Sequence, residues 1–500
     1  MEPRFRSDKT KFIITLLSRV VTALVGIFFV PIYVNLIGIE SYGLISFYST
    51  LVGTLSLLDL GLSTAISRQI SIDRAVNNNL KSTYDLIFSV EIIYWFIAFV
   101  LGVLIVSCSH LIASHWVNAE HLSVSIIQKV VLLMGIVFVF QFPISIYNGV
   151  MMGFERQIQN AVFTAVFSIV KAIGVVFVLM FIEASIEMYF IWQIAITIIF
   201  TLVIRIYIWR PAFLAKIKTV FSWVEIKKIW RFALGITGIS AITFFITQLD
   251  KIVVSKMLTL EYVGYYSLAF LIASAINQLI SPIQPVVFPK LTGLISTNDQ
   301  VSIVKLYHQT ARWVSIIIFP IGCVLFFFAS EILMFWTGNI KLTSNTASIL
   351  QVCVVGSVFN CMMWVPYLFM LAKGNTRFTI YQNSIVIIIM IPLLYFLTKT
   401  YGALGASFVW LIVNTAYVLV SIPVFHHFFL KGELMTWYKN DVALPLIASI
   451  GLVLGIKFFQ IQFDLKFSLL SLTSVLLGIT VIYTLIIPEL RTALNKIIRS

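Results

Sequence analysis

The sequence predicts an all-α integral membrane protein with about fourteen transmembrane helices. Three observations support this prediction. Hydrophobic residues make up 60% of the 500 residues, and charged residues only 11%. Apolar runs of about 20 residues, the length at which a helix crosses a bilayer, recur along the whole chain. Two short segments of the first half also return later at one fixed spacing, which is typical of a duplicated membrane bundle.

The expected spans are the apolar runs, and the charged or Gly- and Pro-containing stretches between them are the connections. The first eleven residues are charged and no small-residue cleavage site follows, so we expect a retained first span and not a signal peptide. The expected spans are residues 12–37, 43–67, 84–107, 124–148, 159–182, 187–209, 231–255, 264–289, 311–336, 346–371, 379–398, 403–425, 442–460 and 466–487.

Two segments recur in the second half at the same offset. Their shared Glu, Gly, Ser and Arg residues are each 221 positions apart. The segments are Ile39-Glu-Ser-Tyr-Gly-Leu-Ile-Ser46 with Leu260-Glu-Tyr-Val-Gly-Tyr-Tyr-Ser267, and Gly153-Phe-Glu-Arg156 with Gly374-Asn-Thr-Arg377. Six spans in each half start and finish on the same side. We therefore expect two parallel repeats related by an axis along the membrane normal.

Basic residues are divided unequally between the two sides. With the N-terminus inside, 25 of the 34 Lys and Arg residues fall in cytoplasmic segments. Only Lys256, Lys341, Lys399 and Lys466 fall on the opposite side. The positive-inside rule then predicts that both termini are cytoplasmic. This placement also accounts for the net charge of +14 without a nucleic-acid partner.

The expected domains are an N-terminal six-helix lobe, an amphipathic cytoplasmic linker, a C-terminal six-helix lobe, and appended helices 13 and 14 with a cytoplasmic tail. Their ranges are 1–209, 210–231, 232–427 and 428–500. Apolar residues of the linker fall at helical spacing between lysines. We expect this stretch to lie along the membrane surface against anionic headgroups, with a soluble partner as the alternative.

Three charged residues are expected at one level of the first half. Counted along their helices, Arg19, Asp59 and Glu91 each lie about seven or eight residues inside the cytoplasmic end of a span. Charges inside a membrane are usually both paired and functional. Either an ion-pair cluster that locks the helices together or an ion-coupling site with a titrating carboxylate would account for them.

Lys171 lies near the middle of the fifth span, and no carboxylate is expected at its depth in the first half. An ammonium at the bilayer centre costs about 2.5–3.5 kcal/mol on insertion scales, so we expect Lys171 to face a wet cavity and bind an anion. Asp250 and Lys251 lie near the outer end of the seventh span. For Lys251, snorkelling to the interface is the alternative to substrate contact.

The other polar residues predict neither a catalytic nor a metal centre. His110, His115 and His121 share an outward loop but lack Cys or carboxylate companions at ligand spacing. The four cysteines form no disulfide framework. Neutral polar residues within spans either hydrogen-bond between helices or contact sugar hydroxyls in a cavity. They are Gln141, Asn148, Gln193, Gln248, Asn277, Gln278, Asn360, Asn383 and Asn414.

Three stretches resemble the polysaccharide-exporter branch of the multidrug, oligosaccharidyl-lipid and polysaccharide superfamily. The likeness covers essentially the whole chain, and the order of the stretches carries it. They are Arg19 with Val30-Pro-Ile-Tyr to Ser46 and Leu57-Leu-Asp-Leu-Gly-Leu62; Asp250-Lys-Ile-Val-Val to Ser267; and Leu371-Ala-Lys-Gly-Asn-Thr-Arg-Phe378.

The resemblance implies two lobes facing each other across a V-shaped cavity in a bacterial inner membrane. It implies a flippase of the O-antigen type, which moves undecaprenyl-diphosphate-linked oligosaccharide to the outer leaflet. Basic residues that line the cavity are expected to contact the diphosphate and acidic sugars, and the positions in this chain are Arg19, Lys171 and Lys251. Asp59, Glu91 and Asp250 are the candidates for ion coupling or ion pairing. A polysaccharide polymerase and a chain-length regulator are candidate partners.

Two other classes of protein compete with the flippase. A cation-coupled multidrug exporter of the same fold would have an acidic cavity, whereas Lys171 predicts a basic one. A membrane-bound polymerase or ligase would carry a large outward loop with catalytic residues, and no expected outward loop exceeds about 16 residues. No Gly-x-x-x-x-Gly-Lys-Ser/Thr loop is present, which argues against direct use of ATP, and no cofactor is expected.

Overall fold

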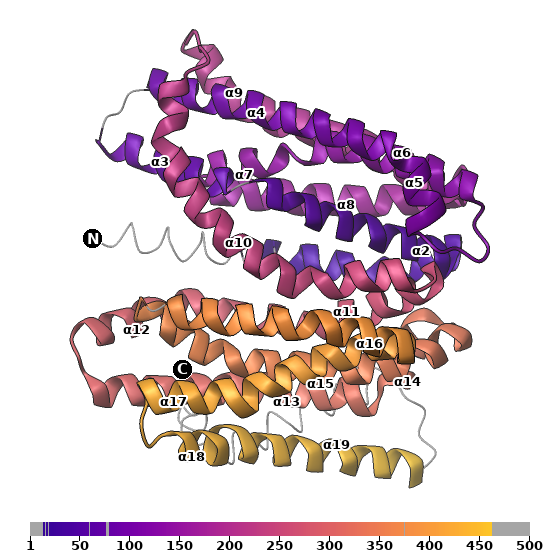
Figure 1. The fold of residues 1–500 in the computed structure, drawn as a ribbon, viewed down its shortest axis with the longest axis vertical. Coiled ribbons are helices and arrows are strands. Elements are labelled where there is room, and N and C mark those ends of the chain that lie inside the picture. Colours follow the sequence, from indigo (N-terminus) through magenta and orange to yellow (C-terminus); the bar gives the residue numbers. More distant parts are fainter. Residues whose placement is uncertain are drawn as a thin grey trace, which may run out of the picture. The chain divides into compact units, whose positions relative to one another are not determined.

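The computed structural model describes residues 14–15, 17–18, 20–59, 61–76, 80–374 and 376–462. These residues are helical almost throughout (Figure 1), as the apolar runs predict. They belong to two compact units, Met1–Gly264 and Tyr265–Ser500, here called unit 1 and unit 2.

Unit 1 is a bundle in which α4, α6, α8 and α9 pack side by side and α3 packs against α7. Its core is a continuous set of buried aliphatic and aromatic side chains. The elements are α2 (Val30–Leu55), η1 (Ser56–Asp59), α3 (Leu62–Val76), α4 (Leu80–Ser107), α5 (Ser109–Leu111), η2 (Ile112–Trp116), α6 (Val124–Gln141), α7 (Ile144–Gly153), α8 (Gln157–Phe181), α9 (Ile186–Leu214) and α10 (Trp223–Met257).

Unit 2 centres on α15, which packs against both α13 and α16, while α13 also packs against α19. The chain enters it through α11, which spans the division between the units. The elements are α11 (Leu260–Ile280), η3 (Ser281–Ile283), α12 (Gln284–Ser296), α13 (Gln300–Phe327), α14 (Ala329–Thr337), α15 (Ile340–Ala372), α16 (Thr376–Ala416), η4 (Tyr417–Ser421), α17 (Ile422–Phe429), α18 (Leu434–Thr436), η5 (Trp437–Ala443) and α19 (Leu444–Gln462).

Ten helical stretches among the described residues are long and apolar enough to cross a membrane. This confirms a multi-pass helical membrane protein but not the number fourteen. One of the ten, Phe378–Phe429, contains two expected spans. The break between them falls at Gly402, whose φ of +60° interrupts the helix where the sequence predicts a turn. The expected span 466–487 lies outside the described residues.

The two copies of the repeated Glu-x-x-Gly motif contact each other within unit 1. A Cβ added at Gly43 would lie 2.1 Å from the backbone oxygen of Leu260, and one added at Gly264 would lie 2.7 Å from the backbone oxygen of Ile39. Ile39 and Leu260 are themselves counterparts in the repeat. The contact is therefore reciprocal, and it requires glycine in both copies because each faces a backbone carbonyl and not a movable side chain.

The loop between η2 and α6, which the sequence places outside, is bonded to the turn between α10 and α11. The backbone oxygen of Asn118 accepts from the Leu260 N–H at 2.7 Å, and its side-chain amide donates to the Lys256 carbonyl at 3.2 Å. The buried Glu40 carboxylate accepts the backbone N–H groups of Glu120 at 2.6 Å and of His121 at 3.1 Å. One Glu of the repeat thus fixes the loop that holds the other copy.

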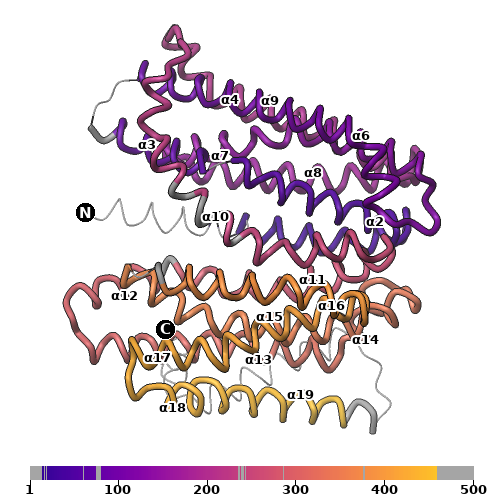
Figure 2. Tube along the Cα trace, in the orientation of Figure 1, coloured from indigo at the N-terminus to yellow at the C-terminus, as the bar shows by residue number. Residues whose placement is uncertain are grey.

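The expected linker is shorter than 210–231, because both flanking helices extend into it. The trace runs along α9 to Leu214, turns, and enters α10 at Trp223 (Figure 2). Apolar side chains at the two helix ends that flank this turn are exposed, Phe213 to 83% and Val224 to 68%, and the membrane-surface position of the stretch stays a prediction. The division into compact units falls one helix later than the sequence suggests, since α10 packs on α2, α3 and α4.

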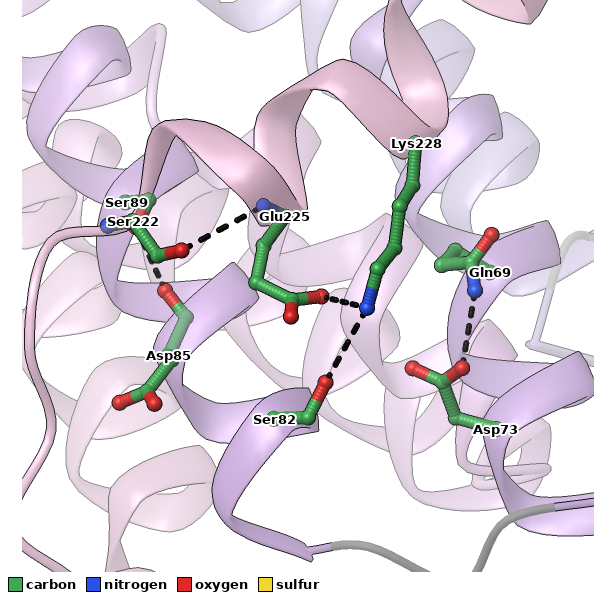
Figure 3. A network of polar contacts seen from close by, with 8 residues as sticks. All are labelled: Gln69, Asp73, Ser82, Asp85, Ser89, Ser222, Glu225 and Lys228. Atoms are coloured by element: carbon green, nitrogen blue, oxygen red, sulfur yellow. Dashed lines mark hydrogen bonds and ion pairs between the residues drawn. The ribbon is translucent and has the colours of Figure 1, made fainter.

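Polar contacts fasten the start of α10 to the start of α4 (Figure 3). The Ser222 N–H donates to the Ser89 hydroxyl at 2.8 Å, and the Ser222 hydroxyl caps α10 at the Glu225 N–H. Lys228 pairs with Glu225 at 2.6 Å and reaches the Ser82 hydroxyl at 3.5 Å. These contacts therefore hold the turn between α9 and α10 against α4.

Candidate functional site

A cavity of about 610 Å³ lies inside unit 1. It is bounded by the ends of α2 and α6, by η1 and the start of α3, and by α7, α8 and α9. Its walls combine aromatic and aliphatic side chains with a group of polar ones, the composition expected of a binding site. The polar lining residues are Ser56, Asp59, Ser63, Gln141, Ser145, Asn148, Thr164, Ser168, Lys171 and Thr197.

One face of α8 supplies the cation of this cavity. Thr164, Ser168 and Lys171 line it together. Their spacing of i, i+4 and i+7 places them on one side of a helix. The Lys171 ammonium makes no ion pair within the described residues, and the indole of Trp192 fixes the helix there by donating to the Lys171 carbonyl at 3.1 Å. The structure thus places Lys171 in a polar cavity, as the sequence predicts.

Asp59 lines the same cavity and is held by hydroxyl groups. Its carboxylate accepts Ser63 at 2.8 Å and Ser145 at 2.9 Å, and it also accepts the hydroxyl of Tyr94. The three donors come from α3, α7 and α4, so the carboxylate joins three helices. Hydrogen bonds to a carboxylate stabilise its charged form.

Among the described residues, the cavity lining contains one basic and one acidic side chain, Lys171 and Asp59. The sequence placed no carboxylate at the depth of Lys171 and did not predict that Asp59 would line the same cavity. Counting residues along a straight second span put Asp59 elsewhere, whereas the helix gives way to the short turn η1 at Ser56–Asp59. Lys171 and Asp59 form no ion pair with each other.

Glu91 belongs to a separate buried cluster. Its carboxylate pairs with the Arg205 guanidinium at 2.5 Å and accepts the Trp209 indole at 2.9 Å and the Tyr147 hydroxyl at 2.7 Å. The Glu91 side chain is 4% exposed and that of Arg205 46%. Arg205 is one of the 25 basic residues assigned to cytoplasmic segments, so this pair was not predicted. Arg19, the basic residue of the expected cluster, lies outside the described residues.

Asp250 and Lys251 are not part of the cavity lining. Asp250 is buried, and the Lys251 ammonium approaches the Thr247 carbonyl of its own helix at 3.5 Å. The structure therefore does not bring Lys251 to Lys171. Substrate contact by Lys251 and ion coupling or ion pairing by Asp250 stay predictions.

The neutral polar residues divide between the two roles that the sequence left open. In unit 2, Asn360 donates to Asn414 at 2.8 Å and Tyr417 donates to Asn383 at 3.3 Å, both between helices. In unit 1, Gln141 and Asn148 line the cavity, and Gln141 Oε1 also accepts the Tyr48 hydroxyl of another helix at 2.7 Å. The Asn148 Oδ1 is buried without a hydrogen-bond partner in the described part of the chain.

The outward loop does have carboxylate companions for its histidine, contrary to the sequence expectation. Ligand atoms of Glu120, His121 and Glu261 lie within 4.8 Å of one another. Glu120 and His121 are exposed, and exposed acidic groups often cluster in this way without a metal ion. The sequence could not reveal the cluster because Glu261 comes from the second copy of the repeat.

The fold and the cavity define a multi-pass α-helical membrane protein with a charged binding cavity among its spans. Residues 9–295 match the family model described as polysaccharide biosynthesis protein. The chain belongs to this family, which confirms the resemblance drawn from its motifs.

Curated relatives and solved structures agree with this assignment. A Shigella flexneri protein assigned as an O-antigen transporter is 21% identical over 379 residues, 75% of this chain and 87% of that protein. An uncharacterized Klebsiella pneumoniae membrane protein of the cps region is 28% identical over 48% of this chain and 49% of its own length.

Among solved structures, the lipid II flippase MurJ in an inward closed conformation has a TM-score of 0.69 at 16% identity, covering 97% of this chain and 98% of that one. An inward-facing multidrug resistance MATE transporter of the MOP superfamily has a TM-score of 0.65 at 13% identity, covering 84% and 96%. At these identities the likeness shows the fold alone.

Proposed function

We propose that the protein is a flippase that moves undecaprenyl-diphosphate-linked oligosaccharide from the cytoplasmic to the outer leaflet of the bacterial inner membrane. The family, the assignment of the Shigella flexneri relative and the fold shared with MurJ support this proposal. The same comparisons favour transport over an enzymatic activity. The solved neighbours include inward- and outward-facing forms, which supports alternating access as the mechanism.

The observation that carries the proposal is the Lys171 ammonium in the cavity of unit 1. A diphosphate cannot enter an apolar bundle unless fixed positive charge and hydrogen-bond donors replace part of its hydration. Lys171 supplies the charge, and the hydroxyls of Thr164 and Ser168 lie on the same helix face. Asn148 and Gln141 add amide groups that suit sugar hydroxyls.

Asp59 is proposed to assist the second step of transport, which is release of the anion. A carboxylate in the same cavity weakens the hold of Lys171 on an anion, which favours release after crossing. The repeat unit is an O-antigen or related polysaccharide unit, and a polymerase that consumes it on the outer face is the expected partner. Both termini are proposed to be cytoplasmic, from the distribution of basic residues.

A cation-coupled multidrug exporter is the second candidate. Asp59 favours it, since a carboxylate in an aromatic-lined cavity suits an organic cation, and Phe138, Phe142 and Phe200 line this cavity. If the protein were a multidrug exporter, the positive charge of Lys171 would repel the cationic substrate. Removal of Lys171 would then raise export of a cationic dye instead of lowering export of polymer.

The test compares Lys171→Ala and Lys171→Arg with Lys129→Ala, an exposed lysine of α6, in cells that depend on this protein for surface polymer. A hydrogen bond to a charged group contributes about 1.5–3 kcal/mol, so Lys171→Ala should lower export by about one to two orders of magnitude. Lys171→Arg should keep part of the activity because it keeps the charge. Lys129→Ala should export normally.

Membrane levels of each variant are measured beside export. Normal polymer on cells that contain ample Lys171→Ala protein would refute the role of Lys171. A fall in protein level that matches the fall in export would assign Lys171 to folding instead. Extrusion of a cationic dye by the wild type, without any effect on polymer, would favour the drug exporter.

A further inference from the structure

Unit 2 contains a cluster of ionisable groups far along the chain from the cavity of unit 1. The imidazole of His308, on α13, lies between two carboxylates. Its Nε2 is 3.0 Å from Glu433, and its Nδ1 contacts Asp441 in η5. The Arg312 Nε lies 3.1 Å from the other oxygen of Asp441. The cluster thus joins α13 to the segment that leads into α19.

Exposure changes stepwise across the imidazole. The side chain of Glu433 is 31% exposed, that of His308 8% and that of Asp441 0%. The two ring nitrogens therefore connect a carboxylate that reaches the surface with one that is fully buried. An imidazole can take up a proton at one nitrogen while the other nitrogen keeps its own hydrogen bond.

The other ionisable groups near His308 in the described part of the chain either have neutral partners or are exposed. The Tyr307 hydroxyl contacts His426 Nε2 at 3.2 Å, and His426 Nδ1 contacts the Ile422 carbonyl at 2.8 Å, so both are occupied by neutral partners. The Tyr438 hydroxyl donates to the Val418 carbonyl at 2.6 Å. The nearby Lys431 and Lys439 are exposed.

The net charge of the cluster therefore depends on whether the His308 imidazole is protonated. Among the described residues of this cluster, Glu433 and Asp441 carry two negative charges, and Arg312 carries one positive charge. A protonated His308 brings the sum to zero, and a neutral one leaves one uncompensated negative charge beside a buried carboxylate. Uncompensated buried charge destabilises the contact that contains it.

We propose that His308, Asp441 and Glu433 form a proton-binding site, and that loss of its proton loosens the segment from Glu433 through α19 from α13. The proton leaves from His308 Nε2 to the Glu433 carboxylate and from there to water, while Nδ1–H stays bonded to Asp441. The segment is held to α13 by this cluster at its start and by apolar packing along α19. The inference does not depend on the cargo of unit 1.

The test is hydrogen exchange of the full-length protein in lipid nanodiscs, followed by mass spectrometry on peptides that cover η5. The readout is the protection factor, which removes the intrinsic effect of pH on exchange. One linked proton changes an equilibrium by up to about tenfold per pH unit, so protection of η5 should fall by up to this factor per unit over the pH range in which the packed cluster still holds its proton but the loosened segment has lost it. Above that range protection should level off.

His308→Gln should abolish that pH dependence, because glutamine keeps a polar group at the site but does not titrate. His427→Gln is the matched control, since His427 is exposed and adjacent to the buried His426. It should behave as the wild type. Protection that does not change between pH 5 and 9 in the wild type, or that changes equally in His308→Gln, would overturn the proposal.

If His308→Gln does not fold, Glu433→Gln replaces it. This change removes one negative charge at the exposed side of the cluster, so the neutral imidazole becomes less unfavourable and the midpoint should move to lower pH. An unchanged midpoint in Glu433→Gln would show that the cluster does not control the segment.

Discussion

Replacing Arg205 of unit 1 should be far more damaging than its half-exposed position suggests. Its partner Glu91 has a side chain only 4% exposed and keeps two neutral donors, Tyr147 and Trp209, when the guanidinium is gone. Arg205→Met therefore leaves a buried carboxylate without a counter-charge. Glu91→Gln leaves Arg205, which is 46% exposed and can be hydrated.

The magnitudes follow from this difference in burial. Loss of a hydrogen bond to a charged group costs about 1.5–3 kcal/mol, so Arg205→Met should lower the free energy of unfolding by about 2–3 kcal/mol. Glu91→Gln should cost about 1 kcal/mol, because the amide oxygen can still accept from Trp209 while the amide NH2 donates to the Tyr147 hydroxyl. The double variant should cost less than the sum, with a coupling energy of about 1–2 kcal/mol.

The assay is denaturant unfolding of the purified protein in one detergent. Arg210→Met, at an exposed arginine further along α9, is the matched control and should change stability little. Simple additivity of the two single changes in the double variant would show that Glu91 and Arg205 do not interact. Equal costs for Arg205→Met and Arg210→Met would show the same.

Two further predictions concern topology and the repeat. Reporter fusions at Asn118 should be active outside the cell and fusions at Lys218 inside, because basic residues concentrate on the cytoplasmic side; an internal Asn118 would reverse the orientation. Gly43→Ala should lower the unfolding free energy by about 1–3 kcal/mol, since its Cβ would lie 2.1 Å from the Leu260 carbonyl oxygen. Gly451→Ala, with nothing within 4 Å, should be neutral by comparison, and equal melting temperatures for both variants would contradict the close contact.

The membrane class and most spans could be predicted because they depend on composition over about 20 residues. The break at Gly402 was also predictable, since a short Gly-containing turn separates two apolar runs. The single helical stretch Phe378–Phe429 shows the limit of this reasoning. Hydropathy finds apolar length, and it does not say whether a turn fully ends one helix or only bends it.

Only part of the candidate site could be predicted from the sequence. Lys171 is conspicuous because a charge at the bilayer centre needs water or a partner. Asp59 was itself a candidate residue, but its place in the same cavity was not predicted because η1 interrupts the helix along which depth was counted. The pairing of Arg205 with Glu91 was not predicted because Arg205 was counted among the cytoplasmic charges, although the expected span 187–209 contains it.

The cluster around His308 could not be foreseen from sequence. Its partners Glu433 and Asp441 lie 125 and 133 residues away along the chain. A single histidine near a helix end carries no local pattern that distinguishes it from an interface residue. Only the packing of η5 on α13 brings the three groups together.

The reciprocal contact between Ile39–Gly43 and Leu260–Gly264 limits how this chain can change over time. It is the arrangement of a self-complementary dimer interface, in which residue i meets residue j while j meets i, yet both copies are on one polypeptide. A larger residue at either glycine cannot be accommodated by a substitution in the other segment, because each glycine faces a main-chain oxygen, which every residue carries. The paired glutamates are under no such restriction, and they have different partners: Glu40 binds backbone N–H groups of Glu120 and His121, whereas the Glu261 carboxylate lies beside the side chains of these two residues. The close approach is thus the same in both segments, while the side chains around it make separate contacts.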